Sequence, residues 1–594
     1  MNIARVALLA LLSAGAGSAS LAQVAAPPAA TSSLFEAASN RKPAETVASG
    51  PGVVSSADVR ASEAGAAMLR RGGSAADAAA ATAIALTVVE PQSSGLGGGA
   101  FVLTHEAKGG RVTALDGRET APAGATPERF LGPDGKPLPF REAVVSGRSV
   151  GVPGLVAVLA ELHARQGRLP WAMLFEPAIA LAADGIVVTP RLARIIAARR
   201  EVLAASGAAA VFLNADGTPK KAGDRIVQPA LAATLRAVAA GGPAAFYGGE
   251  VGAAISAAVA AAPRGPNSLT AADLSGYRVV QRTPLCFPYR QWRVCSMPPP
   301  SAGGYALAQM LAVMARHDVA KLGRDNALSW HLFAEAGRLA QADRAAWGAD
   351  PGFAPVPVDG LTDPAYLAAR AALVRPERAM PAVASGHPPG APAAPAQVAG
   401  GGSGTSHVSA ADAAGNVVSL TSTIESIFGS GQVAAGFFLN NELTDFDLAP
   451  VRADGRPAPN RVEPGKRPRS SMTPVLLYGP DGRLVAAIGA AGGATIIPQV
   501  AKTIIGIVDW KLPVEEAIAL PMLFATPERV AVERGSRLEP MLATLKALGH
   551  NAVAADLPTK TNALVRDGSG WRGAGDARSE GQAVAARGRV RETR

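Results

Sequence analysis

The spacing of apolar and polar positions predicts two Ala-rich helices near the start of the chain. The first begins near Ser56, whose side chain is able to cap it, and ends at Gly72-Gly73. The second begins after Ser74 and ends at Glu90-Pro91, because proline cannot continue a helix. Further helical segments are expected at residues 152–262, after Gly304, at 497–509 and at 513–520.

Short β-rich runs bounded by turn residues predict strands. The expected strands are residues 101–105, 111–115, 417–421, 437–440, 474–478 and 484–489. Helices precede and follow the main block of strands, and this order predicts sheets covered by helical layers.

The stretch from Pro381 to Gly404 follows neither pattern. It consists almost entirely of Ala, Pro and Gly, and it ends with Gly400-Gly-Gly-Ser-Gly404. Such a composition is typical of an exposed flexible segment, and by itself it favours an interdomain linker.

Residues 1–22 predict a signal peptide. A short positive stretch, Met1–Arg5, precedes the apolar run Val6–Ala14, and Ser20-Leu-Ala22 offers small residues for cleavage. The apolar run is too short to span a bilayer, and no other segment is long and apolar enough. We therefore expect a mature chain from Gln23 that is periplasmic or secreted, without stable membrane insertion.

Composition and motifs exclude several classes of protein. With 48% hydrophobic and 18% charged residues, the 594-residue chain is globular in composition. Its net charge of +10 comes from scattered basic residues, so no nucleic-acid partner is expected. No His/Cys group has metal-ligand spacing, no Gly-x-Ser-x-Gly elbow is present, and the glycine cluster at 95–99 follows a helix rather than a strand. Neither a metal nor a cofactor is expected.

Two cysteines, Cys286 and Cys295, lie in one short segment. If Arg290-Gln291 forms a two-residue hairpin turn, the cysteines face each other across the strands. A disulfide is one interpretation, since an oxidising compartment permits it, and two packed thiols in a sheet are the other.

The richest polar stretches follow the Gly-rich segment. They are Thr405-Ser-His-Val-Ser409, Val418-Ser-Leu-Thr-Ser-Thr423-Ile-Glu425, Phe438-Leu-Asn-Asn-Glu442-Leu-Thr-Asp445-Phe446 and Lys466-Arg-Pro-Arg-Ser470-Ser471-Met. These stretches resemble the small subunit of the γ-glutamyltranspeptidase (glutathione hydrolase) family. Earlier segments of the chain resemble the large-subunit signatures of this family. They are Gly72-Gly-Ser-Ala-Ala-Asp77-Ala, Gly95-Leu-Gly-Gly-Gly99, Asp116-Gly-Arg118-Glu-Thr-Ala-Pro122, Gly151-Val-Pro-Gly154 and Ala342-Asp-Arg344. The order and coverage of these motifs argue against a chance match.

The resemblance implies a four-layer αββα sandwich of the N-terminal-nucleophile hydrolase type. It also implies self-cleavage between Gly404 and Thr405, giving a large subunit, residues 23–404, and a small subunit, residues 405–594, that form one heterodimer. Thr405 is then the nucleophile. A threonine hydroxyl needs a base, and the α-amine that cleavage releases, with a pKa of roughly 8, supplies one.

The same resemblance assigns roles around the nucleophile. Thr423 matches the threonine that orients it, and Gly492 and Gly493 match the pair whose N–H groups form the oxyanion hole. Without the resemblance, a buried strand threonine and a strand-to-helix turn would explain these residues. We expect His407 to be structural.

A second group of residues matches the binding site for the γ-glutamyl head. Arg118 corresponds to the arginine that binds the α-carboxylate, because a guanidinium binds a carboxylate through two hydrogen bonds. Its hydrogen-bonding partners are expected to be Ser470 and Ser471. Glu442 and Asp445 correspond to the acids that hold the ammonium, although each alone would be interpreted as a surface charge.

Glu425 departs from the family pattern, which usually has asparagine there. A third acid near the ammonium is either protonated, paired with a basic residue, or a sign of a changed acyl preference. The leading hypothesis is a γ-glutamyl hydrolase/transferase that acts on glutathione and related compounds and passes the acyl group to water, an amino acid or a peptide. The alternatives are a cephalosporin (glutaryl) acylase or other N-acyl amide hydrolase, and an inactive periplasmic binding protein.

Overall fold

The computed structural model describes residues 42–262, 269–392, 404–452 and 454–586. Two seven-stranded antiparallel sheets form its centre. Sheet A has the order β1 (Val47–Gly50), β20 (Gly570–Gly575), β19 (Thr561–Asp567), β15 (Leu484–Ala490), β14 (Val475–Tyr478), β9 (Trp292–Ser296), β8 (Leu285–Tyr289). Sheet B has the order β21 (Gln582–Ala585), β2 (Val53–Ser56), β10 (Gly404–Ala411), β11 (Val417–Glu425), β3 (Gly99–His105), β4 (Val112–Gly117), β7 (Val280–Arg282).

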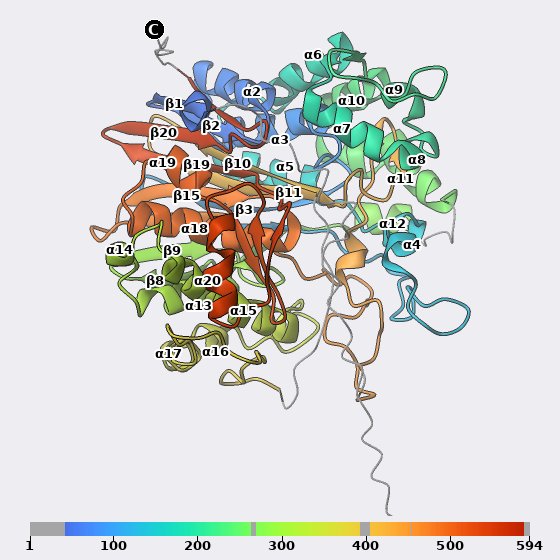
Figure 1. The fold of residues 1–594 in the computed structure, drawn as a ribbon. Helices are drawn as coiled ribbons and strands as arrows, with labels where there is room; N and C mark the ends of the chain where they lie inside the picture. The colour runs from blue at the N-terminus through green and yellow to red at the C-terminus, as the bar shows by residue number, and fades with distance from the viewer. Residues whose placement is uncertain (1–41, 263–268, 393–403, 453, 587–594) are drawn as a thin grey trace, which may run out of the picture.

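The two sheets pack face to face between helical layers, with β10 and β11 against β15 and β19. Sheet B is covered by α2 (Val59–Arg70), α3 (Ala75–Val89) and α5 (Leu155–Gln166). Sheet A is covered by α13 (Gly303–Ala315), α18 (Ile496–Val508) and α19 (Val514–Ala519). Figure 1 shows α2 and α3 above the strands and α13 below them. This arrangement confirms the predicted αββα sandwich.

Other elements surround this sandwich. They include α6 (Glu176–Asp184), α7 (Pro190–Ala198), α10 (Pro229–Tyr247) and α11 (Gly249–Ala260) in the predicted helical region, α15 (Ala327–Trp347) and α17 (Pro364–Ala371) near α13, and a small sheet of β16 (Leu523–Ala525), β17 (Val530–Glu533) and β18 (Ala552–Ala555). None of the described helices is both long and apolar enough to cross a membrane. The predicted signal peptide, residues 1–22, lies outside the described residues.

The two N-terminal helices form where the sequence predicts them, but one cap differs. Ser74 caps α3 through a capping box with Asp77, as expected. Ser56 does not cap α2, because it belongs to β2 and its hydroxyl pairs with Ser62. Asp58 accepts a hydrogen bond from the first turn instead. Every residue of α3 is buried, and its alanines let α2 and sheet B approach closely.

Most predicted strands form with small shifts at their ends. The segment 437–440 is the exception, because only Phe437–Phe438 is a strand, β13, which pairs with β12 (Val433–Ala434). The Asn440 side chain instead bonds the carbonyl groups of Gly97 and Gly151, and these bonds hold the chain away from regular pairing. Gly404, which the composition assigns to the linker, begins strand β10, while residues 393–403 lie outside the described residues.

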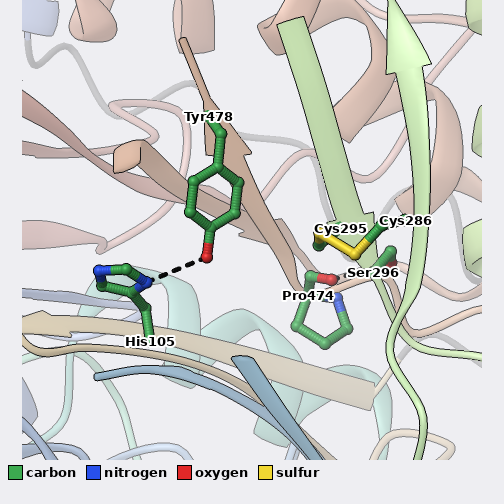
Figure 2. The surroundings of a disulfide bond; sticks show 6 residues. All are labelled: His105, Cys286, Cys295, Ser296, Pro474 and Tyr478. Atoms are coloured by element: carbon green, nitrogen blue, oxygen red, sulfur yellow. Dashed lines mark hydrogen bonds between the residues drawn. A yellow bond between two sulfur atoms is a disulfide. The ribbon is translucent and has the colours of Figure 1, made fainter. Parts of the chain in front are cut away.

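The hairpin of β8 and β9 carries a disulfide between Cys286 and Cys295, which settles the choice between a bond and two thiols (Figure 2). The turn residue Arg290 has a positive φ of 53°, as a tight hairpin requires. In Figure 2, the ring of His105 on β3 faces the hydroxyl of Tyr478 on β14, 3.1 Å away. This hydrogen bond links sheet B to sheet A.

Candidate active site

Strands β10 and β11 bring the predicted nucleophile and its partner together. Thr405 on β10 pairs with Thr423 on β11, whereas Gly404 pairs with Glu425, so Ile424 is an extra residue on β11. Glu425 has a positive φ of 75° at this point. A β-bulge of this kind interrupts regular pairing and redirects side chains. The irregularity lies opposite the Gly404–Thr405 peptide bond.

The hydroxyl of Thr423 contacts both sides of that peptide bond. It donates a hydrogen bond to the carbonyl oxygen of Gly404 and accepts one from the Thr405 hydroxyl, with 3.2 Å between the two hydroxyl oxygens. The backbone N–H of Glu425 donates to the same oxygen of Thr423 at 2.8 Å. Thr405 and Thr423 are both buried. A hydroxyl thus lies next to a carbonyl group whose oxygen already has a hydrogen-bond donor.

Glycines make room for this close packing. A Cβ atom on Gly404 would lie 2.6 Å from the carbonyl oxygen of Ser426. A Cβ atom on Gly98 would lie 2.0 Å from the carbonyl oxygen of Thr423. Larger residues would therefore displace the backbone of β11. In the glycine cluster at 95–99, this close approach to β11 accounts for a glycine at position 98.

The turn after β15 carries the predicted oxyanion-hole glycines. Gly492 and Gly493 have φ values of 128° and 61°, in the region that glycine favours. Their N–H groups donate to no acceptor among the described residues. Lys560 connects this turn to Thr405: its ammonium donates to the Thr405 carbonyl at 2.9 Å, and its own carbonyl accepts from Ala491 at 3.1 Å.

Arg118 lies in a buried pocket of mixed charge. Its guanidinium forms ion pairs with Glu442 and with Asp445, the latter at 2.6 Å. It also donates to the carbonyl oxygens of Pro468 at 3.2 Å and Arg469 at 2.7 Å. Only 1% of its surface is exposed. The predicted carboxylate-binding and ammonium-binding side chains are therefore in direct contact with each other.

Ser470 and Ser471 directly follow the carbonyl groups that bind this guanidinium. Backbone hydrogen bonds from Ser470 to Pro300 and from Ala302 to Ser470, at 3.0 and 2.9 Å, hold the pair beside the start of α13. Both serines are buried. The two serines therefore lie beside the segment that binds Arg118, but the guanidinium bonds the carbonyl groups of Pro468 and Arg469 and neither serine hydroxyl among the described residues.

The carboxyl group of Glu425 is buried at the edge of the same pocket. It accepts hydrogen bonds from the Ser426 hydroxyl at 2.5 Å and from the side-chain amide of Asn441. No lysine or arginine among the described residues forms an ion pair with it. Burial, together with Asp445 and Glu442, raises the pKa of Glu425 to about 8. Of the three explanations open for this acid, the protonated form agrees with its surroundings.

His407 lies between the sheets, where Thr421 and Ser409 contact its two ring nitrogens at 2.9 and 3.0 Å. Burial lowers the pKa of His407 to about 3, so the ring is neutral. This environment agrees with a structural role.

Three further residues join the site without having been singled out from the sequence. Glu119 follows Arg118 and is fully buried, and burial raises the pKa of Glu119 to about 7 although Arg118 opposes the shift. Lys560 and Glu90 form a buried ion pair behind Thr405. The sequence predicts Glu90 as a helix end and as part of Val89-Glu-Pro91, which resembles a large-subunit signature, but it assigns this acid no role; no local pattern marks Lys560.

The αββα fold, with a threonine at the start of a central strand, defines the class of N-terminal-nucleophile hydrolases. The family model described as Gamma-glutamyltranspeptidase matches residues 61–586, and the chain belongs to this family. It is therefore an enzyme of the γ-glutamyl hydrolase/transferase type.

Similar proteins include hydrolases and acylases. The chain is 35% identical to the glutathione hydrolase proenzyme of Escherichia coli (strain K12), covering 97% of each chain. It is 37% identical to the acylase ACY 1 proenzyme of Pseudomonas sp. (strain V22), covering 83% of this chain and 86% of the relative. A crystal structure of cephalosporin acylase from Bacillus halodurans matches with a TM-score of 0.79 and 27% identity, over 91% of this chain and 97% of that one.

The raised pKa of Glu425 predicts a pH-dependent stability. The folded protein binds a proton here that the unfolded chain loses near its ordinary pKa of 4.5, so this contribution to stability is lost as the pH rises from about 4.5 to about 8. Glu425→Gln removes the effect. We expect the variant to melt a few degrees higher than the wild type at pH 9. At pH 5 the difference in melting temperature should be smaller, as measured by differential scanning calorimetry. An advantage that is equal at both pH values would contradict a buried, protonated carboxyl.

Proposed function

We propose that the chain cleaves itself between Gly404 and Thr405 and that the new N-terminal Thr405 then carries a γ-glutamyl group from donor to acceptor. The observation that supports this most directly is the position of the Thr423 hydroxyl, which bonds both the Thr405 hydroxyl and the Gly404 carbonyl. The products are a large subunit, residues 23–404, and a small subunit, residues 405–594, held together in one sandwich.

Self-cleavage follows from the chemistry of these groups. The Thr405 oxygen attacks the Gly404 carbonyl carbon, and Thr423 stabilises the charge on the carbonyl oxygen. The C–N bond then breaks, its nitrogen takes up the hydroxyl proton and becomes the free α-amine, and an ester joins Gly404 to the Thr405 oxygen. Water hydrolyses the ester, which leaves a carboxylate on Gly404 and restores the hydroxyl.

Catalysis would then use the same groups on a substrate. The α-amine takes the proton of the Thr405 hydroxyl, the oxygen attacks the γ-amide carbonyl, and the amine product leaves with that proton. The N–H groups of Gly492 and Gly493 would stabilise the developing oxyanion. Water or the amine of an amino acid or peptide then accepts the γ-glutamyl group from Thr405.

The mixed charge of the pocket favours a zwitterionic head over a glutaryl group. A γ-glutamyl α-carboxylate would pair with Arg118, Ser470 and Ser471, and the α-ammonium with Glu442 and Asp445. The substrate carboxylate would thus take the place of the acids beside Arg118, and the substrate ammonium would take the place of Arg118 beside the acids. A glutaryl group brings only a carboxylate, so it would leave the acids without a partner, at a high cost in buried charge.

The compartment of the enzyme is also part of the proposal. The predicted signal peptide, the disulfide of the β8–β9 hairpin and the word proenzyme in the names of relatives support a processed enzyme in the periplasm or outside the cell. The mechanism needs no cofactor.

Cleavage is predicted to depend on two threonines. Thr405→Ala should leave one uncut chain in intact-mass measurements, whereas Thr405→Ser keeps a hydroxyl and should still be cut. Thr423→Val should slow cleavage by about 10²-fold, because the scissile carbonyl loses its donor. Ser409→Ala on β10, the strand that carries Thr405, is the matched control and should mature normally. A small subunit that begins elsewhere than at Thr405 would refute the assignment.

Substrate preference separates the proposed activity from that of an acylase. We expect kcat/KM for a γ-glutamyl anilide to exceed that for the glutaryl anilide by about 100-fold or more, because only the former supplies the ammonium. Asp445→Asn should lower the γ-glutamyl value by about 10-fold to 100-fold and narrow this ratio. A wild-type enzyme that prefers the glutaryl anilide would instead support the acylase alternative.

A further inference from the structure

A buried ion pair lies directly behind the nucleophile. Lys560 precedes β19, and its ammonium pairs with Glu90 at the end of α3 and donates to the Thr405 carbonyl at 2.9 Å. The hydroxyls of Ser93 and Ser406 each lie 3.3 Å from the ammonium nitrogen. Lys560 is 4% exposed and Glu90 is fully buried.

The main chain of the same lysine holds the glycine turn after β15. Its carbonyl accepts from the N–H of Ala491 at 3.1 Å, and its N–H donates to the side chain of Gln499 at 2.9 Å. The amide of Gln499 in turn donates to the Ala491 carbonyl at 2.7 Å. Lys560 therefore contacts Thr405 through its side chain and the start of the Gly492–Gly493 turn through its backbone.

A charge in this position is costly. Burial lowers the pKa of Lys560 to about 8 although Glu90 favours the charged form. The pKa of Glu90 is lowered despite its burial, because Lys560 and Arg191 stabilise its charge. A buried pair seldom stabilises a fold more than apolar residues of the same size would. Stability alone is therefore a weak reason for an ammonium at this point.

We propose that Lys560 is a positioning residue that fixes the Thr405 backbone against the Gly492–Gly493 turn and, after cleavage, keeps the Thr405 α-amine unprotonated at neutral pH. The α-nitrogen and carbonyl oxygen of one residue are at most about 3.7 Å apart, and the ammonium lies 2.9 Å from the carbonyl oxygen, so it lies within about 6.6 Å of the α-amine. A positive charge that close disfavours a second one and lowers the pKa of the amine. The inference rests on the proposed function.

Other charges around the amine determine the size of this effect. They are Arg191, which pairs with Glu90 at 2.7 Å, Glu580 near Lys560, Glu425 across from Gly404 on β11, and the neutral ring of His407. Glu90 is paired with both Lys560 and Arg191, so these three groups together carry one positive charge in the wild type. Removing the lysine alone leaves no net charge from this group beside the amine, and the same removal together with Glu90→Gln restores one positive charge.

The test is the pH profile of kcat/KM for a γ-glutamyl anilide. In Lys560→Met, the acidic limb should move up by about 1 to 2 pH units, because the amine holds its proton more tightly. Activity near pH 6.5 should fall by about tenfold or more and recover at pH 9. Lys560→Arg keeps the cation and should keep the limb within about half a unit of the wild type. If Lys560→Met causes the same shift of the acidic limb when Glu425 is also replaced by glutamine, the titrating group is the α-amine and not the Glu425 carboxyl.

Neutralising the other member of the pair supplies the matched control. Glu90→Gln should move the limb down, and the double variant Lys560→Met/Glu90→Gln should return it towards the wild type. A uniform loss of kcat with an unmoved limb would overturn the inference. If Lys560→Met does not cleave itself, the pH profile of Glu90→Gln is the sole test. An acidic limb that is unshifted in Glu90→Gln would then overturn the inference. A wild type that neither cleaves before Thr405 nor turns over the anilide would instead refute the proposed function.

Discussion

The pairing of β10 with β11 is the constraint on which the rest of the site depends. One extra residue, Ile424, shifts the register so that Thr405 lies opposite Thr423 and Gly404 opposite Glu425. That shift sets the Thr423 hydroxyl on the carbonyl of the proposed scissile bond and places Glu425 at the edge of the acyl pocket. Thr405, Thr423 and Glu425, the proposed nucleophile, orienting residue and pocket acid, thus share one local irregularity in an otherwise regular sheet. The helical layers and sheet A serve to bury it.

Charge is organised differently on the two sides of Thr405. In the proposed acyl pocket, the cation of Arg118 meets the carboxylates of Glu442 and Asp445, an arrangement that a zwitterionic substrate head would replace. Behind Thr405, Lys560 and Glu90 form a pair that no substrate group would exchange. The first set of charges would select the acyl group, and the second would set the protonation of the base. Both are buried, which strengthens their effect on a neighbouring charge.

Local patterns were enough to predict much of the fold, whereas long-range contacts were not. Helix and strand periodicity gave the layers, and the resemblance located the candidate site, since its motifs are contiguous. The prediction that Ser56 caps α2 was wrong, because β2 extends to Ser56 and Asp58 caps the helix instead. The short β13 reflects side-chain bonds of Asn440 to distant glycines. The ion pair of Lys560 with Glu90 joins residues 470 positions apart, so no local pattern could indicate it.

The central claim is that Thr405 carries the acyl group. Mature enzyme mixed with a γ-glutamyl anilide and quenched in acid during turnover should yield a small subunit that is heavier by one γ-glutamyl group. Peptide mapping by mass spectrometry should place that group on the peptide that begins with Thr405, and hydroxylamine, which cleaves esters, should remove it. Turnover without any acyl group on this peptide, or with the group on another residue, would contradict the account.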